Sequence, residues 1–171
     1  CGTMSVGKTT LVNALKELKQ FKDYNFATER SQHLMSLGIP LNTDSTLKGQ
    51  TVFLAERCGE LMHDDIITDR TILDVMAFTM NAKSIPHQDK DAFEVYASEF
   101  IREYDYIFYI SPHGIEIEDN GIRETDEHYR DLIDFTITTL IKRHGHKAGK
   151  IEKISGSTEE RIQQILNITS L

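Results

Sequence analysis

The chain begins CGTMSVGKTTL, in which Gly2 to Thr9 follow the pattern Gly-x-x-x-x-Gly-Lys-Thr. Glycines at both ends of this pattern allow the backbone to curl until its N–H groups face a phosphate chain. A helix that follows directly adds the positive end of its dipole. The pattern therefore predicts a phosphate-binding loop between a strand and a helix, and we expect that strand to precede Cys1.

Two residues of this pattern have a defined chemistry. The Lys8 ammonium would reach the β- and γ-phosphates of a nucleotide, and the Thr9 hydroxyl would bind Mg²⁺. The alternative is a Gly-Lys turn that precedes a helix by chance. The complete match, and the helical spacing of Leu11, Leu15 and Leu18 behind it, favour the nucleotide site.

Strand-like and helix-like segments alternate along the rest of the chain. Runs of β-branched and aromatic residues predict strands at 24–28, 65–68, 106–110 and 151–155. Apolar residues at helical spacing predict helices at 8–20, 34–37, 43–62, 72–81, 89–103, 126–143 and 158–168, the third of them capped by Thr43, Asp44 or Ser45. This alternation predicts an α/β fold with a parallel sheet covered on both faces, and 171 residues suit a single domain, 1–171.

An acidic residue followed by arginine ends two of the predicted strands. Asp69 and Arg70 lie where ligands of open α/β sheets bind, so the carboxylate would hold Mg²⁺ and the guanidinium a phosphate. The alternative is an exposed ion pair in which Asp69 caps the next helix and Asp74 lies in its first turns. Glu29 would accept the proton of an acceptor hydroxyl or bind a sugar hydroxyl, with Arg30 beside it on a phosphate or base. This second pair is equally consistent with a solvated helix start.

Two arginines follow a polar, turn-rich loop at 111–125. Arg123 and Arg130 are seven residues apart, which is two helical turns if a helix continues between them. Both would supply positive charge over the phosphates as a lid closes. The alternative is that they pair with acidic neighbours in the loop.

Polar residues also recur along the helix predicted at 43–62. They are Gln50, Glu56, Arg57 and Glu60. We expect Gln50 to face the acceptor of the phosphoryl group and most of the others to face solvent.

Charge and cysteine content restrict the partners. The 19 basic and 27 acidic residues give a formal net charge of −8, which repels nucleic acid unless basic residues cluster locally. Cys1 and Cys58 form neither a Cys-x-x-Cys motif nor a Cys/His ligand set, so we expect reduced thiols in a cytoplasmic protein, without a zinc site. An apolar run of about eighteen residues, as a membrane span needs, does not occur.

With GTMSVGKTT, ATER, TDRTILDVMAF, EDNGIRETDEHYR and ISGSTEER in this order, the sequence resembles the P-loop nucleoside and nucleotide kinases. It is most similar to the branch that contains the NadR-type ribosylnicotinamide kinases and their phage and eukaryotic relatives. The resemblance implies a three-layer P-loop NTPase sandwich whose parallel five-stranded sheet has the order 2-3-1-4-5. It also implies a lid at about 112–130 and the use of ATP with Mg²⁺.

The resemblance assigns roles by matching position. It places Asp69 at the metal, Arg70 at the phosphate, and Arg123 and Arg130 in the lid. A separate Walker B segment is missing from the sequence, so Asp69 would do its work unless Thr9 and the phosphates hold the metal. The expected nucleotide contacts are Gly2, Met4, Ser5, Val6, Gly7, Lys8, Thr9, Thr10, Ser155, Gly156 and Ser157, and the expected acceptor contacts are Glu29, Arg30, Gln50 and Asp74.

The sequence thus predicts an ATP-dependent kinase that moves the γ-phosphoryl to a nucleoside, a nucleotide or a similar small molecule. One alternative acceptor is a hydroxymethylated base within DNA, on which phage kinases of this build act. Another alternative is a nucleotide-dependent switch or binding module that regulates a partner. No membrane partner is expected, and a homodimer is left open as the assembly.

Overall fold

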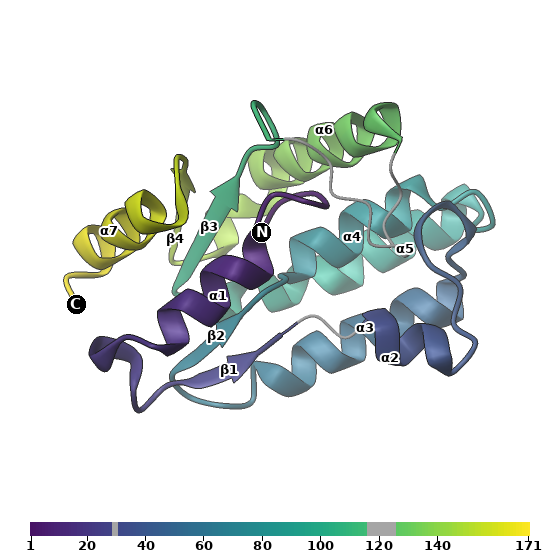
Figure 1. The fold of residues 1–171 in the computed structure, drawn as a ribbon. Helices are drawn as coiled ribbons and strands as arrows, with labels where there is room; N and C mark the ends of the chain where they lie inside the picture. Colours follow the sequence, from purple (N-terminus) through teal and green to yellow (C-terminus); the bar gives the residue numbers. More distant parts are fainter. Residues whose placement is uncertain (29–30, 116–125) are drawn as a thin grey trace.

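The strands form two parallel pairs (Figure 1). The computed structural model describes residues 1–28, 31–115 and 126–171. Strand β1 (Asn25–Ala27) pairs with β2 (Ile66–Thr68), and β3 (Tyr106–Ile110) pairs with β4 (Lys150–Ile154). Both pairings are parallel, as predicted. The expected continuous five-stranded sheet is not formed by the described residues, which give two two-stranded sheets. If the strand expected before Cys1 is counted as the first, these pairs are strands 2 and 3 and strands 4 and 5, which are neighbours in the order 2-3-1-4-5. The full order stays a prediction.

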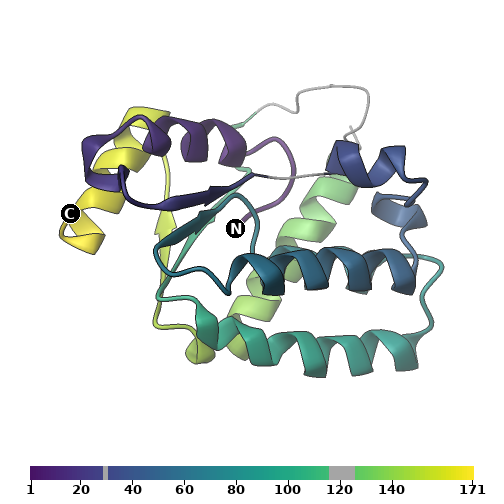
Figure 2. The ribbon, with the colours of Figure 1, turned by 90° about the horizontal axis from the view of Figure 1, so that it is seen from below.

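Helices lie on both faces of the strands (Figure 2). On one face α1 (Lys8–Lys16) packs against α7 (Thr158–Thr169). The other face carries α3 (Leu47–Glu60), α4 (Ile72–Asn81), α5 (His87–Ser98) and α6 (Glu127–His144). Successive residues of β3 serve the two faces, because neighbouring side chains of a strand point in opposite directions. Ile107 packs in the core with α4 and α6, whereas Ile110 packs in the core with α1 and α7.

Helix α4 (Ile72–Asn81) is the centre of the larger core, and its bounds agree with the prediction. Eight of its ten residues are buried, and it contacts α3 (Leu47–Glu60), α5 (His87–Ser98) and α6 (Glu127–His144). A helix that is apolar on all sides belongs inside the protein. The start of α4, which directly follows Arg70, is therefore held from three directions.

Several predicted helix ends were wrong by a few residues. Helix α1 ends at Lys16 and is followed by a 3₁₀ turn, η1 (Lys19–Phe21), whose Phe21 is buried. Helix α3 is capped by Thr46, whose hydroxyl accepts from the Gly49 amide, and not by the three preceding polar residues. Thr43 and Asp44 belong instead to the 3₁₀ turn η2 (Asn42–Asp44), a local structure that short polar side chains favour. The short helix α2 spans Ser31–Ser36, and α5 continues into η3 (Glu99–Glu103).

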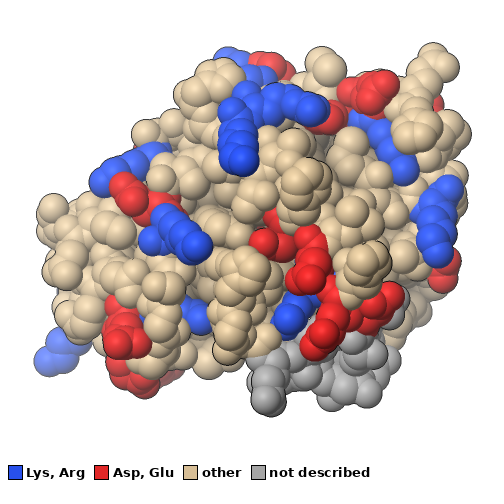
Figure 3. Space-filling view, turned by 90° about the horizontal axis from the view of Figure 1, so that it is seen from above, with Lys and Arg blue, Asp and Glu red and all other residues tan. Residues whose placement is uncertain are grey.

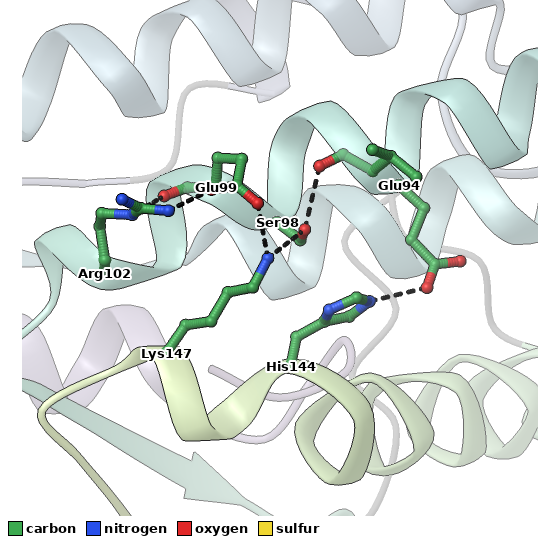
Figure 4. Close-up of polar contacts among 7 residues, drawn as sticks. Glu94, Ser98, Glu99, Arg102, His144 and Lys147 are labelled. Atoms are coloured by element: carbon green, nitrogen blue, oxygen red, sulfur yellow. Dashed lines mark hydrogen bonds and ion pairs between the residues drawn. The ribbon is translucent and has the colours of Figure 1, made fainter.

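Polar contacts join α5 and η3 to the end of α6 and the following 3₁₀ turn η4 (Gly145–Lys147) (Figure 4). The Glu94 carboxylate lies 2.8 Å from the His144 ring and 2.5 Å from Arg143. The Lys147 ammonium donates to Ser98 and to Glu99, both at 2.8 Å. Burial raises the pKa of the Glu94 carboxyl, but the bonds from His144 and Arg143 outweigh it and leave the pKa below its usual value. These contacts fix the far end of α6 relative to α5.

The first residue of the chain, Cys1, is hydrogen-bonded to the last residue of β3. The Cys1 carbonyl accepts from the Ile110 amide at 3.0 Å, so residues 2–8 begin at the carboxyl end of that strand. A phosphate loop in an α/β protein occupies this edge of the sheet. Within the described residues no helix is long and apolar enough to cross a membrane.

Candidate nucleotide and acceptor sites

The predicted phosphate loop adopts the backbone that its glycines allow. Gly2 has φ 147° and Gly7 has φ 79°, and a Cβ on Gly2 would lie 2.6 Å from the Ile110 carbonyl oxygen. Helix α1 begins at Lys8 without a side-chain cap and without an acidic residue in its first turn. Its first amides are therefore left to an incoming anion, as at other helix N-termini that bind phosphate.

The Lys8 side chain folds back into this loop. Its ammonium donates to the carbonyls of Gly2 and Thr3, each at 2.7 Å. In a loop whose amides face a phosphate, the carbonyls face the other way and need a hydrogen-bond donor of their own. A triphosphate on the amides would offer the ammonium a charged partner in place of two neutral ones.

A hydroxyl and a carboxylate meet beside the loop. Thr9 donates from Oγ1 to Asp69 Oδ2 at 2.5 Å, and Asp69 is 3% exposed. Asp69 follows β2 directly, and its amide donates to the Ala27 carbonyl of β1. Hydroxyl and carboxylate oxygens are ligands that Mg²⁺ takes beside phosphate. The two side chains predicted to hold the metal thus lie together and fit one hard cation.

Asp74 fastens the loop to helix α4. One of its oxygens accepts from the Gly2 amide at 3.0 Å, and the other accepts from the amide and hydroxyl of Thr71, both at 2.8 Å. Thr71 caps α4, and with Asp74 it forms a capping box, so the alternative that Asp69 caps the helix is wrong. Asp74 is fully buried and lies outside the lining of the pocket described next. Both of its oxygens are bonded within the protein, and its assignment as an acceptor contact stays a prediction.

A second site lies between α3 and α4. It has a volume of about 40 Å³, which holds a few water molecules. Gln50, an expected acceptor contact, and Arg70, expected at the phosphate, both line it, and the Arg70 guanidinium lies 5.3 Å from the centre of the Phe78 ring. The full lining comprises Ser31, Leu41, Asn42, Ser45, Gln50, Phe53, Arg57, Arg70, Val75 and Phe78.

Arg57 in this pocket corrects one expectation. The sequence placed it with the solvent-facing residues of its helix, but it is 3% exposed, and its Nη2 donates to Glu60 at 2.6 Å. Its Nε and Nη1 lack a hydrogen-bond partner among the described residues. Arg57 lies seven residues after Gln50, so the two-turn spacing along α3 is the signal that would have placed both in one pocket.

The predicted lid residues are described only in part. Arg130, in the first turn of α6, is buried; it donates to the Ile115 carbonyl at 2.7 Å, and its own carbonyl accepts from Thr3 of the loop at 3.3 Å. Arg130 therefore lies next to the phosphate loop. Arg123 and the acceptor-side pair Glu29 and Arg30 lie outside the described residues.

The segment expected near the base follows β4. Ser155, Gly156 and Ser157 are exposed, and Ser157 caps α7 in a second capping box with Glu160. Gly156 has φ 93°, and a Cβ there would collide with the Glu160 carboxylate. Only glycine fits this turn without strain.

Arg161, one turn into α7, was not predicted as a site residue. The residue is 7% exposed, and its guanidinium donates from Nη1 to the Val6 carbonyl of the loop at 2.7 Å. Burial lowers the pKa of this guanidinium from its usual value. Its position in the segment ISGSTEER was the only sequence signal that pointed to it. The contact with Val6 could not be predicted, because the two residues are 155 positions apart.

Comparison with known proteins agrees with this geometry. The solved structure of deoxyadenosine kinase from M. mycoides with bound dCTP is similar over 99% of this chain and 97% of its own, with a TM-score of 0.67 and 17% identity. The YorR protein from Bacillus subtilis, in complex with phosphorylated GDP, is similar over 100% of this chain and 94% of its own, with a TM-score of 0.57 and 13% identity. These likenesses show the fold of the P-loop kinases, and no curated protein matches the chain.

The likeness to the NadR-type branch stays a prediction. A family model described as an AAA domain matches residues 1–161, which is nearly the whole chain and includes the phosphate loop, both strand pairs and the start of α7. The chain therefore belongs to this AAA domain family.

Proposed function

We propose that this protein is an ATP-dependent kinase that transfers the γ-phosphoryl group to a nucleoside or nucleotide acceptor. The observation that carries the proposal is the position of two consecutive residues. Asp69 contacts Thr9 of the phosphate loop, whereas Arg70 lines the pocket between α3 and α4. A donor site and an acceptor site therefore meet at the end of β2.

The chain's own residues supply positioning and charge. Lys8 would leave the loop carbonyls for the β- and γ-phosphates, and Arg70 and Arg130 would neutralise charge from the acceptor side and the lid side. Mg²⁺, held by Thr9 and Asp69, would neutralise the phosphate oxygens of the donor. We assign Arg123 to the lid and Glu29 to the acceptor hydroxyl as parts of the same proposal. Transfer of a phosphoryl group requires alignment of this kind more than covalent chemistry.

The acceptor pocket favours a small planar molecule. Gln50 offers an amide that can donate and accept, and Phe53 and Phe78 offer ring faces. At about 40 Å³ the pocket is smaller than a nucleoside, so its walls would separate when the acceptor enters. The solved relatives bind dCTP and phosphorylated GDP, which agrees with an acceptor or product of this class.

The face drawn in Figure 3 gives less support to DNA than to a small molecule as the acceptor. Figure 3 shows Lys and Arg side chains in small groups, with acidic and uncharged residues between them. Duplex DNA binds to surfaces that neutralise several phosphates in a row. The net charge of −8 acts in the same direction.

Acceptor-dependent release of ADP tests the proposal. Purified protein with MgATP is offered ribo- and deoxynucleosides, mononucleotides, ribosylnicotinamide and duplex DNA with hydroxymethylated bases, and phosphorylated products are identified by mass spectrometry. We expect release with a small acceptor, and a loss of about 100-fold or more in Lys8→Ala. Lys16→Ala, on the exposed face of the same helix, is the matched control and should retain activity. ATP consumption at one rate with and without every acceptor would refute the kinase and favour the switch.

A further inference from the structure

Arg161 carries a buried charge that no carboxylate balances. Among residues 1–28, 31–115 and 126–171, no carboxylate oxygen lies within 4.0 Å of its guanidinium. Its Nε is also without a hydrogen-bond partner in this part of the chain. An arginine keeps its proton at neutral pH even when buried. A charge in this position is poorly solvated unless an opposite charge approaches it.

The neighbour of this charge is the back of the phosphate loop. The Arg161 Nη1 lies 2.7 Å from the Val6 carbonyl oxygen and 3.3 Å from the Cβ position that a side chain at Gly7 would take. Gly7 is the last loop residue before α1, whose uncapped amides face the phosphate position. The guanidinium therefore supports the loop through a backbone carbonyl, whereas a phosphate would bind to the loop amides.

Ligand binding would affect the Arg161 bond to Val6 differently from the Lys8 bonds to Gly2 and Thr3. The Lys8 ammonium occupies the carbonyls of Gly2 and Thr3 and would be drawn to an incoming phosphate. The Arg161 bond goes to the Val6 carbonyl and is buried. It can hold the loop carbonyl inward while the amides are occupied.

Helix α7 also connects Arg161 to the turn expected near the base. The Ser157 carbonyl accepts from the Arg161 amide at 3.0 Å, so one helical turn separates the arginine from the capped turn at 155–157. The capping box between Ser157 and Glu160 stabilises that turn, and the Glu160 carboxylate leaves no room for a Cβ at Gly156. The same short helix segment thus reaches both the base side and the phosphate side of the nucleotide site.

We propose that Arg161 is a positioning residue for the polyphosphate: its buried guanidinium holds the phosphate loop through Val6, and its unbalanced charge favours ligands with more phosphate groups. This inference rests on the proposed nucleotide site. It predicts that the contribution of Arg161 to binding increases from AMP to ADP to ATP. A purely structural arginine would affect all three ligands alike.

Isothermal titration of the full chain with MgATP, MgADP and AMP tests this prediction without any acceptor. We expect Arg161→Met to weaken MgATP by about 10-fold and AMP by less than about 2-fold, with MgADP between them. Arg161→Lys should recover most of the MgATP affinity, because it keeps the charge although it loses the planar donor. Arg102→Met removes one positive charge from an exposed site on η3 and should leave all three affinities unchanged.

Three results would overturn the inference. One is an equal loss for all three ligands in Arg161→Met, another is an unchanged MgATP affinity, and the third is the same loss in Arg102→Met. Circular dichroism checks that each variant is folded; if Arg161→Met is not, Arg161→Gln, which removes the charge but keeps N–H donors, replaces it with the same expected order of losses and the same overturning results. Failure of the unchanged protein to bind MgATP would overturn the proposed nucleotide site itself, which separates the two proposals.

Discussion

Removal of the Asp74 carboxylate should destabilise the fold and loosen the phosphate loop together. Asp74→Ala would leave the Gly2 and Thr71 amides and the Thr71 hydroxyl without their acceptor, in a place where Asp74 is 0% exposed. A buried donor without a partner costs about 1–3 kcal/mol, and loss of a helix cap about 1 kcal/mol. Because the three donors share one acceptor, their costs do not simply add, and we expect a loss of about 2–4 kcal/mol in the free energy of unfolding.

Asp74→Asn removes the charge of the side chain but keeps its shape, so it separates the two contributions to stability. The amide keeps one acceptor oxygen but presents an N–H₂ group to one of the two sites, so about half of the loss should remain. Urea unfolding followed by circular dichroism gives the free energies, and titration with MgATP at low urea reports on the loop. If both variants unfold within 0.5 kcal/mol of the unchanged protein, the bonds to Gly2 and Thr71 do not support the fold. If stability falls and MgATP affinity does not, Asp74 holds α4 but not the loop.

Two further substitutions test the turn at 155–157 and the contacts between α5 and α6. Gly156→Ala should lower stability by about 1–2 kcal/mol in thermal unfolding, because of its φ of 93° and the collision with Glu160; Gly59→Ala in α3, where a Cβ has open space, should be neutral or stabilising, and equal effects would contradict the strain. Glu94→Gln should cost about 1 kcal/mol at neutral pH. Because the folded pKa of Glu94 is lowered, its contribution is present above the unfolded pKa of about 4.5 and is lost as the pH falls through the folded value. The free energies of unfolding of Glu94→Gln and the unchanged protein should therefore converge below pH 4.5. A difference that stays constant with pH would refute the link to ionisation of Glu94.

Local signals in the sequence predicted the elements that local chemistry decides. Strand β3, aromatic and β-branched throughout, and helix α4, apolar at most of its positions, have the predicted bounds. The end of α1 was missed because Phe21 is drawn into the core beside α7, a tertiary preference that outweighs helical periodicity. The cap of α3 was missed by one residue, since several adjacent polar residues could serve and packing selects among them.

The candidate site divides in the same way. The loop, Lys8 and the pair Asp69 and Arg70 could be read from the sequence because each is a short pattern at a predictable edge of the sheet. The partners that come from distant segments could not be read. Gly2 meets Asp74 across 72 positions and Val6 meets Arg161 across 155, and neither pairing leaves a mark in local spacing.

These distant contacts explain why donor and acceptor sites can work as one unit. Asp69, Arg70, Thr71 and Asp74 form one continuous segment at the start of α4, and three of them contact different parts of the machinery: Asp69 the metal-side hydroxyl, Arg70 the acceptor pocket and Asp74 the first amide of the loop. Helix α4 is itself buried among α3, α5 and α6, so this segment cannot shift without disturbing the larger core. In the proposed kinase, an acceptor in contact with Arg70 would therefore act on a rigid support that also carries the proposed donor loop. Such a support keeps the two reacting groups aligned at low entropic cost, which is the main requirement of phosphoryl transfer.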